Sequence, residues 1–144
     1  MFANQIGYYS LILGLMFSFL LCIVSIKDFN INSKQINQNI LSLSFIQVVL
    51  VIISFLSLIL SFVNSDFSNE TVFNNSHTTK PLFYKISGTW GNHEGSLLLW
   101  LLVLNIFLFI FLISSKKLLI KYRLLTILFQ ELIIIGFLLF ILFT

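Results

Sequence analysis

The stretch GTWGNHEGSLLLW, residues 88–100, interrupts an otherwise apolar sequence with side chains that could do chemistry. Its candidate residues are Trp90, Gly91, His93, Glu94, Gly95 and Trp100. A His–Glu pair could bind a ligand or relay a proton, and two indole rings could contact a flat aromatic group. The residues alone favour an anchoring role, in which the tryptophans mark a membrane boundary and the glycines permit a tight turn. The functional alternative is a docking surface for a flat aromatic group or for a partner that carries one.

The other residues with possible ligand chemistry show no spacing of a known site. His77 lies in a polar segment with Asp66 and Glu70, but their separation does not match a metal-ligand motif. The His–Glu pair is not part of an HExxH sequence, which excludes a zincin site. Cys22 is the single cysteine, so no disulfide forms within the chain. We therefore predict no catalytic residue and no metal site in this chain.

Gln130 and Glu131 form a polar pair inside an apolar run near the end of the sequence. An ionised side chain at the centre of a bilayer costs at least about 2.5 kcal/mol, so Glu131 is expected to face other helices or to be protonated. We interpret it as a hydrogen-bonding residue that contacts another span or subunit with help from Gln130. The alternative is a proton path through the membrane.

The elements that position these residues are indicated by composition. The chain is 58% hydrophobic and 9% charged, whereas soluble proteins carry roughly 25% charged residues. A helix needs roughly 20 apolar residues to cross a bilayer, and strict two-residue alternation typical of a barrel is absent. We predict an all-α, polytopic membrane protein that forms one membrane domain over residues 1–144. Its transmembrane helices are expected near residues 5–26, 41–63, 96–114 and 124–143.

Basic residues indicate how these helices are oriented. Six of the eight lie in the segments 27–39 and 114–123, whereas the segment 64–95 holds two bases and three acids. The positive-inside bias then places the first two segments in the cytoplasm or matrix. Both termini and the segment 64–95 face the opposite compartment, with the Trp-flanked stretch. In that outward loop we expect turns, an extended backbone at Lys80-Pro81 and one short helix.

Several motifs resemble one protein family over the whole chain. The segment DFSNETVFNNSHTTKPLFYKISGTWGNHEGSLLLWLLVLNIF resembles the N-terminal region of CcmF, the membrane haem lyase of the System I pathway of cytochrome c maturation. The resemblance rests on the DFS at 66–68, on Tyr84-Lys85 and on the block at 90–100. QIGYYSLIL at 5–13 and GFLLFILFT at 136–144 are similar to the opening and to the fourth span of that family. Glu131 departs from it, because a small residue follows the glutamine there.

The resemblance implies a role in attaching haem to apocytochrome c, with haem delivered by a CcmE-like chaperone. Family members hold haem with a tryptophan-rich WWD loop and with histidines that have no counterpart here, because His77 and His93 do not match those positions. The resemblance thus implies that haem acts through an assembled complex and is not bound by this chain alone. The implied partners are a CcmF-like chain with the WWD loop, CcmH-like and CcmE-like proteins, apocytochrome c and membrane lipid, but no nucleic acid.

The sequence stops within or just past its fourth span, which suggests the N-terminal portion of a longer protein. Together with the AT-rich coding that its composition indicates, this favours a split mitochondrial form of the family. We expect it in the mitochondrial inner membrane, with the outward loop in the intermembrane space. The alternative location is a bacterial plasma membrane, with that loop in the periplasm.

Other functions remain open from the residues alone. The chain could be a non-catalytic structural subunit of a respiratory or related complex, or a proton-conducting element built on Glu131. Two acceptor sequons, Asn69-Glu70-Thr71 and Asn74-Asn75-Ser76, would also suit a glycosylated protein of the secretory pathway.

Overall fold

A computed structural model describes residues 2–31 and 38–143, so Met1, the segment 32–37 with Lys34, and Thr144 lie outside the described residues. Within these ranges the regular secondary structure is entirely helical. Four helices of the described part are long and apolar enough to cross a membrane, which confirms the predicted all-α, polytopic fold. They are α1 (Phe2–Asn30), α2 (Gln38–Val63), α5 (His93–Ser114) and α6 (Ile120–Phe143).

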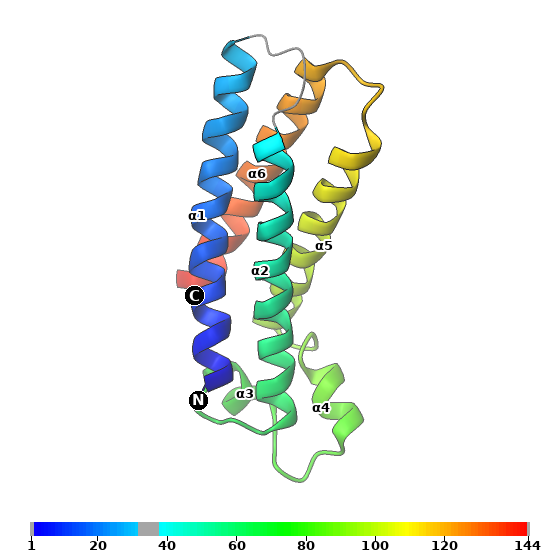
Figure 1. The fold of residues 1–144 in the computed structure, drawn as a ribbon. Helices are drawn as coiled ribbons and strands as arrows, with labels where there is room; N and C mark the ends of the chain where they lie inside the picture. The colour runs from blue at the N-terminus through cyan, green and yellow to red at the C-terminus, as the bar shows by residue number, and fades with distance from the viewer. Residues whose placement is uncertain (1, 32–37, 144) are drawn as a thin grey trace.

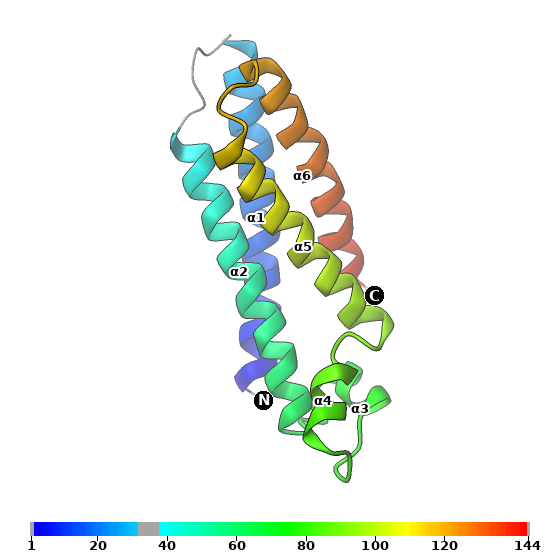
Figure 2. The same cartoon turned by 90° about the vertical axis from the view of Figure 1, so that its right-hand side faces the viewer.

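The four long helices form an up-down-up-down bundle (Figures 1 and 2). α1 packs against α2 and α6, and α5 packs against α2 and α6, so the helices close into a ring. The connection between α5 and α6 lies at the same end as the end of α1 and the start of α2. The start of α1, the end of α6 and the segment 64–92 lie toward the other end. The relative placement of loops and termini therefore agrees with the prediction, while the compartment that each end faces remains a prediction.

The long helices extend beyond the uncharged runs from which they were predicted. α1 continues through Lys27 to Asn30, and α6 begins at Ile120 and contains Lys121 in its first turn. A charge is costly in the hydrocarbon core but not in the headgroup region, so the helix continues where the apolar run ends. Likewise, α5 begins at His93 after its cap Asn92, three residues before the predicted start near residue 96.

The segment 64–92 contains two short helices, so the expectation of one short helix was wrong. They are α3 (Glu70–Asn75) and α4 (Leu82–Gly88). α3 begins because the side chain of Asn69 accepts a hydrogen bond from the backbone N–H of Thr71. α4 follows Pro81, whose ring fixes φ near the helical value. The predicted turn after α2 is present, with Ser65 in the left-handed region at φ 53°.

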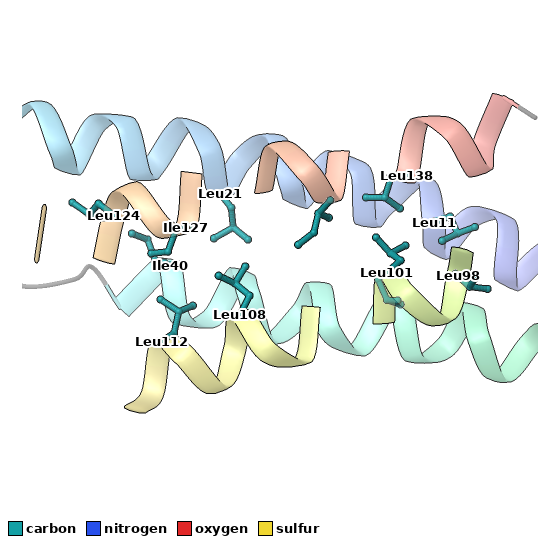
Figure 3. Close-up of a cluster of buried hydrophobic side chains, with 12 residues drawn as sticks. Leu11, Leu21, Ile40, Leu98, Leu101, Leu108, Leu112, Leu124, Ile127 and Leu138 are labelled. Atoms are coloured by element: carbon teal, nitrogen blue, oxygen red, sulfur yellow. The ribbon is translucent and has the colours of Figure 1, made fainter. Parts of the chain in front are cut away.

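Two kinds of packing hold the bundle together. Leucine and isoleucine side chains from all four long helices fill its interior (Figure 3). Between α1 and α2 the buried positions are instead mostly small, including Gly7, Ser18 and Ser57. A Cβ added at Gly7 would lie 2.8 Å from the Ser57 hydroxyl oxygen. Such small residues let transmembrane helices approach closely, which provides van der Waals contact where the hydrophobic effect provides little.

Candidate functional site

The Trp-flanked turn between α4 and α5 is held by one side chain. The Oδ1 atom of Asn92 accepts a hydrogen bond of 2.7 Å from the N–H of Gly95, which caps the start of α5. Its Nδ2 group donates to the carbonyl oxygens of Gly88 and Thr89, at 2.9 Å and 3.2 Å. Asn92 therefore joins the end of α4 to the first turn of α5 and fixes the path of the chain between them.

Gly95 is required by a close backbone contact in the same turn. A Cβ atom at this position would lie 1.7 Å from the carbonyl oxygen of Thr89, which is itself fully buried. No side chain can occupy that space without moving the backbone. The glycine before it differs, because a Cβ at Gly91 would meet its nearest neighbour, the carbonyl oxygen of Ser87, at 3.5 Å.

The side chains predicted to form one docking surface point in different directions. Trp90 lies exposed in the turn, and Trp100 is exposed on α5. His93 lies seven residues before Trp100, on the same face of the helix, and its ring contacts the edge of Phe140 of α6 at a centroid distance of 5.8 Å. Glu94 faces another side, where it lines a cavity. The turn thus presents an aromatic side and an acidic side.

The cavity beside Glu94 has a volume of about 270 Å³ and lies at the end of the bundle that carries α3. Residues of α1, α2, α3 and α5 line it, and its polar groups include Asn4, Tyr8, Glu70 and Glu94. Asn69, the cap of α3, donates a hydrogen bond of 2.9 Å to the side chain of Asn4, so α3 is attached to α1. Asn69 was predicted only as a glycosylation acceptor, and its capping role was not predicted, although an asparagine directly before a short helix is typical of a cap.

Glu131 lies completely buried near the middle of the bundle. The Nε2 group of Gln47 on α2 donates to a carboxylate oxygen of Glu131 at 3.2 Å and to the Ser18 hydroxyl of α1 at 2.7 Å. Three helices therefore meet in one hydrogen-bonded group, which we call the Ser18–Gln47–Glu131 network. The expected contact with another span is present.

Gln130 does not help Glu131 to form this contact, contrary to the expectation from their adjacent positions. Gln130 points toward α5 and donates a hydrogen bond of 2.7 Å to the carbonyl oxygen of Leu104. Gln47 was not predicted, because an uncharged amide interrupts an apolar run less clearly than a carboxylate does. Both Gln47 and Glu131 lie roughly 15 Å from the start of their helices at about 1.5 Å per residue, so matching depth was a signal that could have paired them.

The Ser18–Gln47–Glu131 network leaves two buried oxygens, Oε1 of Glu131 and Oε1 of Gln47, without a hydrogen-bond partner among the described residues. An unsatisfied buried polar atom costs about 1–3 kcal/mol. The hydrogen bonds that the network does form therefore matter for the relative placement of α1, α2 and α6.

The remaining candidate, His77, is exposed in the link between α3 and α4. Across the described ranges, no group of three or more histidine, cysteine, aspartate or glutamate side chains is placed to hold a metal ion. The two histidines lie on different segments: His93 contacts α6, whereas His77 lies between α3 and α4.

Several known proteins are similar to this chain in sequence. The cytochrome c-type biogenesis protein CcmF of Haemophilus influenzae is 34% identical over 140 residues, which cover 97% of this chain and 22% of the relative. CycK of Bradyrhizobium diazoefficiens, also a cytochrome c-type biogenesis protein, is 42% identical over 101 residues, 70% of this chain and 15% of the relative. This chain is a CcmF-family sequence. CcmF of Escherichia coli is likewise 41% identical over 91 residues, 63% of this chain and 14% of the relative.

The comparisons confirm the family resemblance seen in the motifs. The chain spans about a fifth or less of the length of these CcmF-family relatives. No family model matches the chain. No solved structure is significantly similar to it.

Proposed function

We propose that this chain is a subunit of a membrane haem lyase for cytochrome c maturation. In that role it helps to dock haem, its chaperone or apocytochrome c at the outward end of the bundle. The relatives are cytochrome c-type biogenesis proteins by name. The structural observation that carries the proposal is the Trp-flanked turn, because Asn92 and Gly95 hold it in one conformation while Trp90 and His93 stay exposed. A fixed, exposed aromatic turn suits recognition of a partner.

The residues of the turn support positioning of haem rather than its ligation. The imidazole of His93 lies against Phe140, and within the described ranges it belongs to no group of three or more histidine, cysteine, aspartate or glutamate side chains that could hold a metal ion. The nearby cavity has Glu70 and Glu94 among its lining residues, and these would repel the propionates of haem. Haem is therefore a substrate that the assembly handles, and we place its ligands on a partner chain that carries the WWD loop.

The remaining parts of the assembly follow from the same proposal. CcmH-like and CcmE-like proteins and apocytochrome c would meet the outward end, where α3, α4 and the turn lie together. The lysine-rich end would face the matrix, and the turn the intermembrane space, in a mitochondrial inner membrane. In a bacterial plasma membrane the same orientation would place the turn in the periplasm.

Depletion of the chain tests the proposal. Haem staining of c-type cytochromes after denaturing electrophoresis should fall, because covalent haem attachment would fail, and re-expression of the chain should restore it. The variant Trp90→Ala should restore it less well than Phe107→Ala, the same truncation at an exposed aromatic residue of α5 away from the turn. Normal c-type cytochromes in depleted cells would contradict the proposal.

A second function is favoured by the Ser18–Gln47–Glu131 network, which stabilises the bundle without a chemical role. The chain would then be a non-catalytic structural subunit of a respiratory or related complex. In that case Trp90→Ala and His93→Ala should leave c-type cytochromes unchanged, while disruption of the network should reduce assembly of the host complex on native gels.

A further inference from the structure

A groove follows the outer side of the seam between α5 and α6. It consists of two hollows of about 510 Å³ and 420 Å³, which meet at Ile133 because that residue lines both. The groove runs from Tyr122 near the lysine-rich end to His93 and Phe140 near the outward end. The rise from Tyr122 to Phe140 is about 27 Å at about 1.5 Å per residue. That length matches the hydrocarbon core of a bilayer, about 30 Å.

Polar side chains occur along this groove where lipid alone would leave them without partners. The Nε2 group of Gln130 donates a hydrogen bond to the carbonyl oxygen of Leu104. Its Oε1 atom accepts no hydrogen bond within the described residues. The hydroxyl group of Tyr122 and the ring nitrogens of His93 form none within those ranges either, but they lie near the two ends of the groove, where headgroups and water can reach them. At the depth of Gln130, acyl chains cannot hydrogen-bond to the amide oxygen, whereas side chains on a neighbouring helix can.

One position in the groove is also shaped for close approach. Gly136 lines the outward hollow and is exposed, and a Cβ atom placed on it would meet nothing within 4 Å. A glycine on the outer face of a transmembrane helix lets a second helix pack closely against its backbone.

We propose that a transmembrane helix of another polypeptide, the one that carries the remaining CcmF-type sequence, docks along the α5–α6 groove. The inference rests on the proposed function, because it assumes an assembly with such a chain. The relatives are much longer than this chain: even the alignment that covers 97% of this chain covers only 22% of the Haemophilus influenzae protein. In that relative, more than three quarters of the polypeptide is available to pack against the part that corresponds to this bundle.

The occupant should carry recognisable chemistry. It should place a hydrogen-bond donor opposite Gln130 and a small or flat side chain over Gly136. Near the outward end it should offer a polar group to His93. An acyl chain of lipid offers no hydrogen-bonding group to Gln130, and the experiment below distinguishes the proposed helix from lipid and from a second copy of this chain.

Site-specific photocrosslinking in native membranes tests the occupant. Benzoylphenylalanine replaces Ile133, which is 52% exposed in the groove, or Ile23 of α1, which is 60% exposed and does not line it. Mass spectrometry of the Ile133 product should identify an apolar segment of about 20 residues in a chain similar to the rest of the CcmF relatives, and Ile23 should not yield that segment. Products at Ile133 with lipid only, with a second copy of this chain, or with the same segment as Ile23 would overturn the proposal.

A substitution series gives an independent measurement. Ile133→Trp fills the groove and should shift the chain from its assembly to a smaller species on native gels, with at least a fivefold loss of the assembled form. Ile23→Trp is the matched control and should leave the assembly intact. Both purified variants should unfold in detergent at the same temperature as the wild type, because both side chains point out of the bundle. Equal retention of both variants in the assembly would overturn the inference.

The two proposals fail in different ways. If depletion of the chain lowers c-type cytochromes but Ile133 does not crosslink to the expected helix, the haem lyase role stands and the groove proposal fails. If depletion leaves c-type cytochromes unchanged, the proposed function fails first, and a helix crosslinked at Ile133 would then come from a different complex.

Discussion

The substitution Gly95→Ala should open the Trp-flanked turn. The added Cβ would start 1.7 Å from the Thr89 carbonyl oxygen, and Cβ contacts below 3.0 Å essentially do not occur, so the backbone must move by at least 3.0 − 1.7 = 1.3 Å. Movement of that size breaks the 2.7 Å bond between the Gly95 N–H and Asn92. Loss of a helix cap costs about 0.5–2 kcal/mol and overpacking about 1–3 kcal/mol. We expect a total destabilisation of about 1.5–5 kcal/mol.

Intrinsic fluorescence gives a local assay for this prediction. The chain has two tryptophans, Trp90 and Trp100, and both lie close to the altered position. Emission followed through a titration with sodium dodecyl sulfate in mild detergent should show an earlier transition for Gly95→Ala and a changed starting spectrum. Gly91→Ala is the matched control, because its Cβ would meet its nearest atom at an ordinary 3.5 Å. If both variants unfold at the wild-type midpoint, the close contact does not constrain the turn and the reasoning is refuted.

Three further predictions concern buried polar groups. Gln47→Leu removes two hydrogen bonds and leaves Glu131 without its donor. The free energy of unfolding in detergent should therefore fall by about 1–3 kcal/mol. Unchanged stability would show that the network contributes nothing. Glu131→Gln keeps an acceptor for Gln47 and should leave both stability and c-type cytochromes near wild type, whereas loss of c-type cytochromes with normal assembly would support a proton path. Arg123→Met removes the bonds of the guanidinium to the Ser115 hydroxyl and to the Leu112 carbonyl, at 2.8 Å and 2.6 Å. Amide hydrogen exchange at the end of α5 should then accelerate, and Arg123→Lys should restore part of the protection.

Sequence patterns predicted the long helices and the ends at which the loops lie, because both depend on local properties. A run of about 20 apolar residues must be a spanning helix in lipid, and lysines mark one end of each hairpin. The start of α5 lies three residues before its predicted position, because the capping Asn92 lets the helix begin ahead of the apolar run. These conclusions need no knowledge of which helices become neighbours.

The candidate site was less predictable, because it depends on how each helix is rotated about its axis and on the order of the helices around the bundle. His93 and Glu94 are adjacent in sequence, but about 100° separates successive residues on a helix, so one faces α6 and the other faces α1 and α3. That division could have been derived from the helical period alone. The pairing of Gln47 with Glu131 could not, because equal depth makes the two residues candidates for a contact but does not show that α2 and α6 bring them together across the bundle.

The polar residues of this chain lie at two depths of the bundle. Variants at the two depths should therefore affect stability and recognition differently. The Ser18–Gln47–Glu131 network lies near mid-membrane and contacts no exposed surface, so its loss should affect folding and assembly before it affects partner binding. The Trp-flanked turn lies at one end, where Asn92 fixes the backbone and leaves Trp90 free to contact a partner. A variant of the turn that keeps normal stability but loses c-type cytochromes would therefore locate recognition at Trp90. A variant of the network that loses both together would show only that the bundle must be intact.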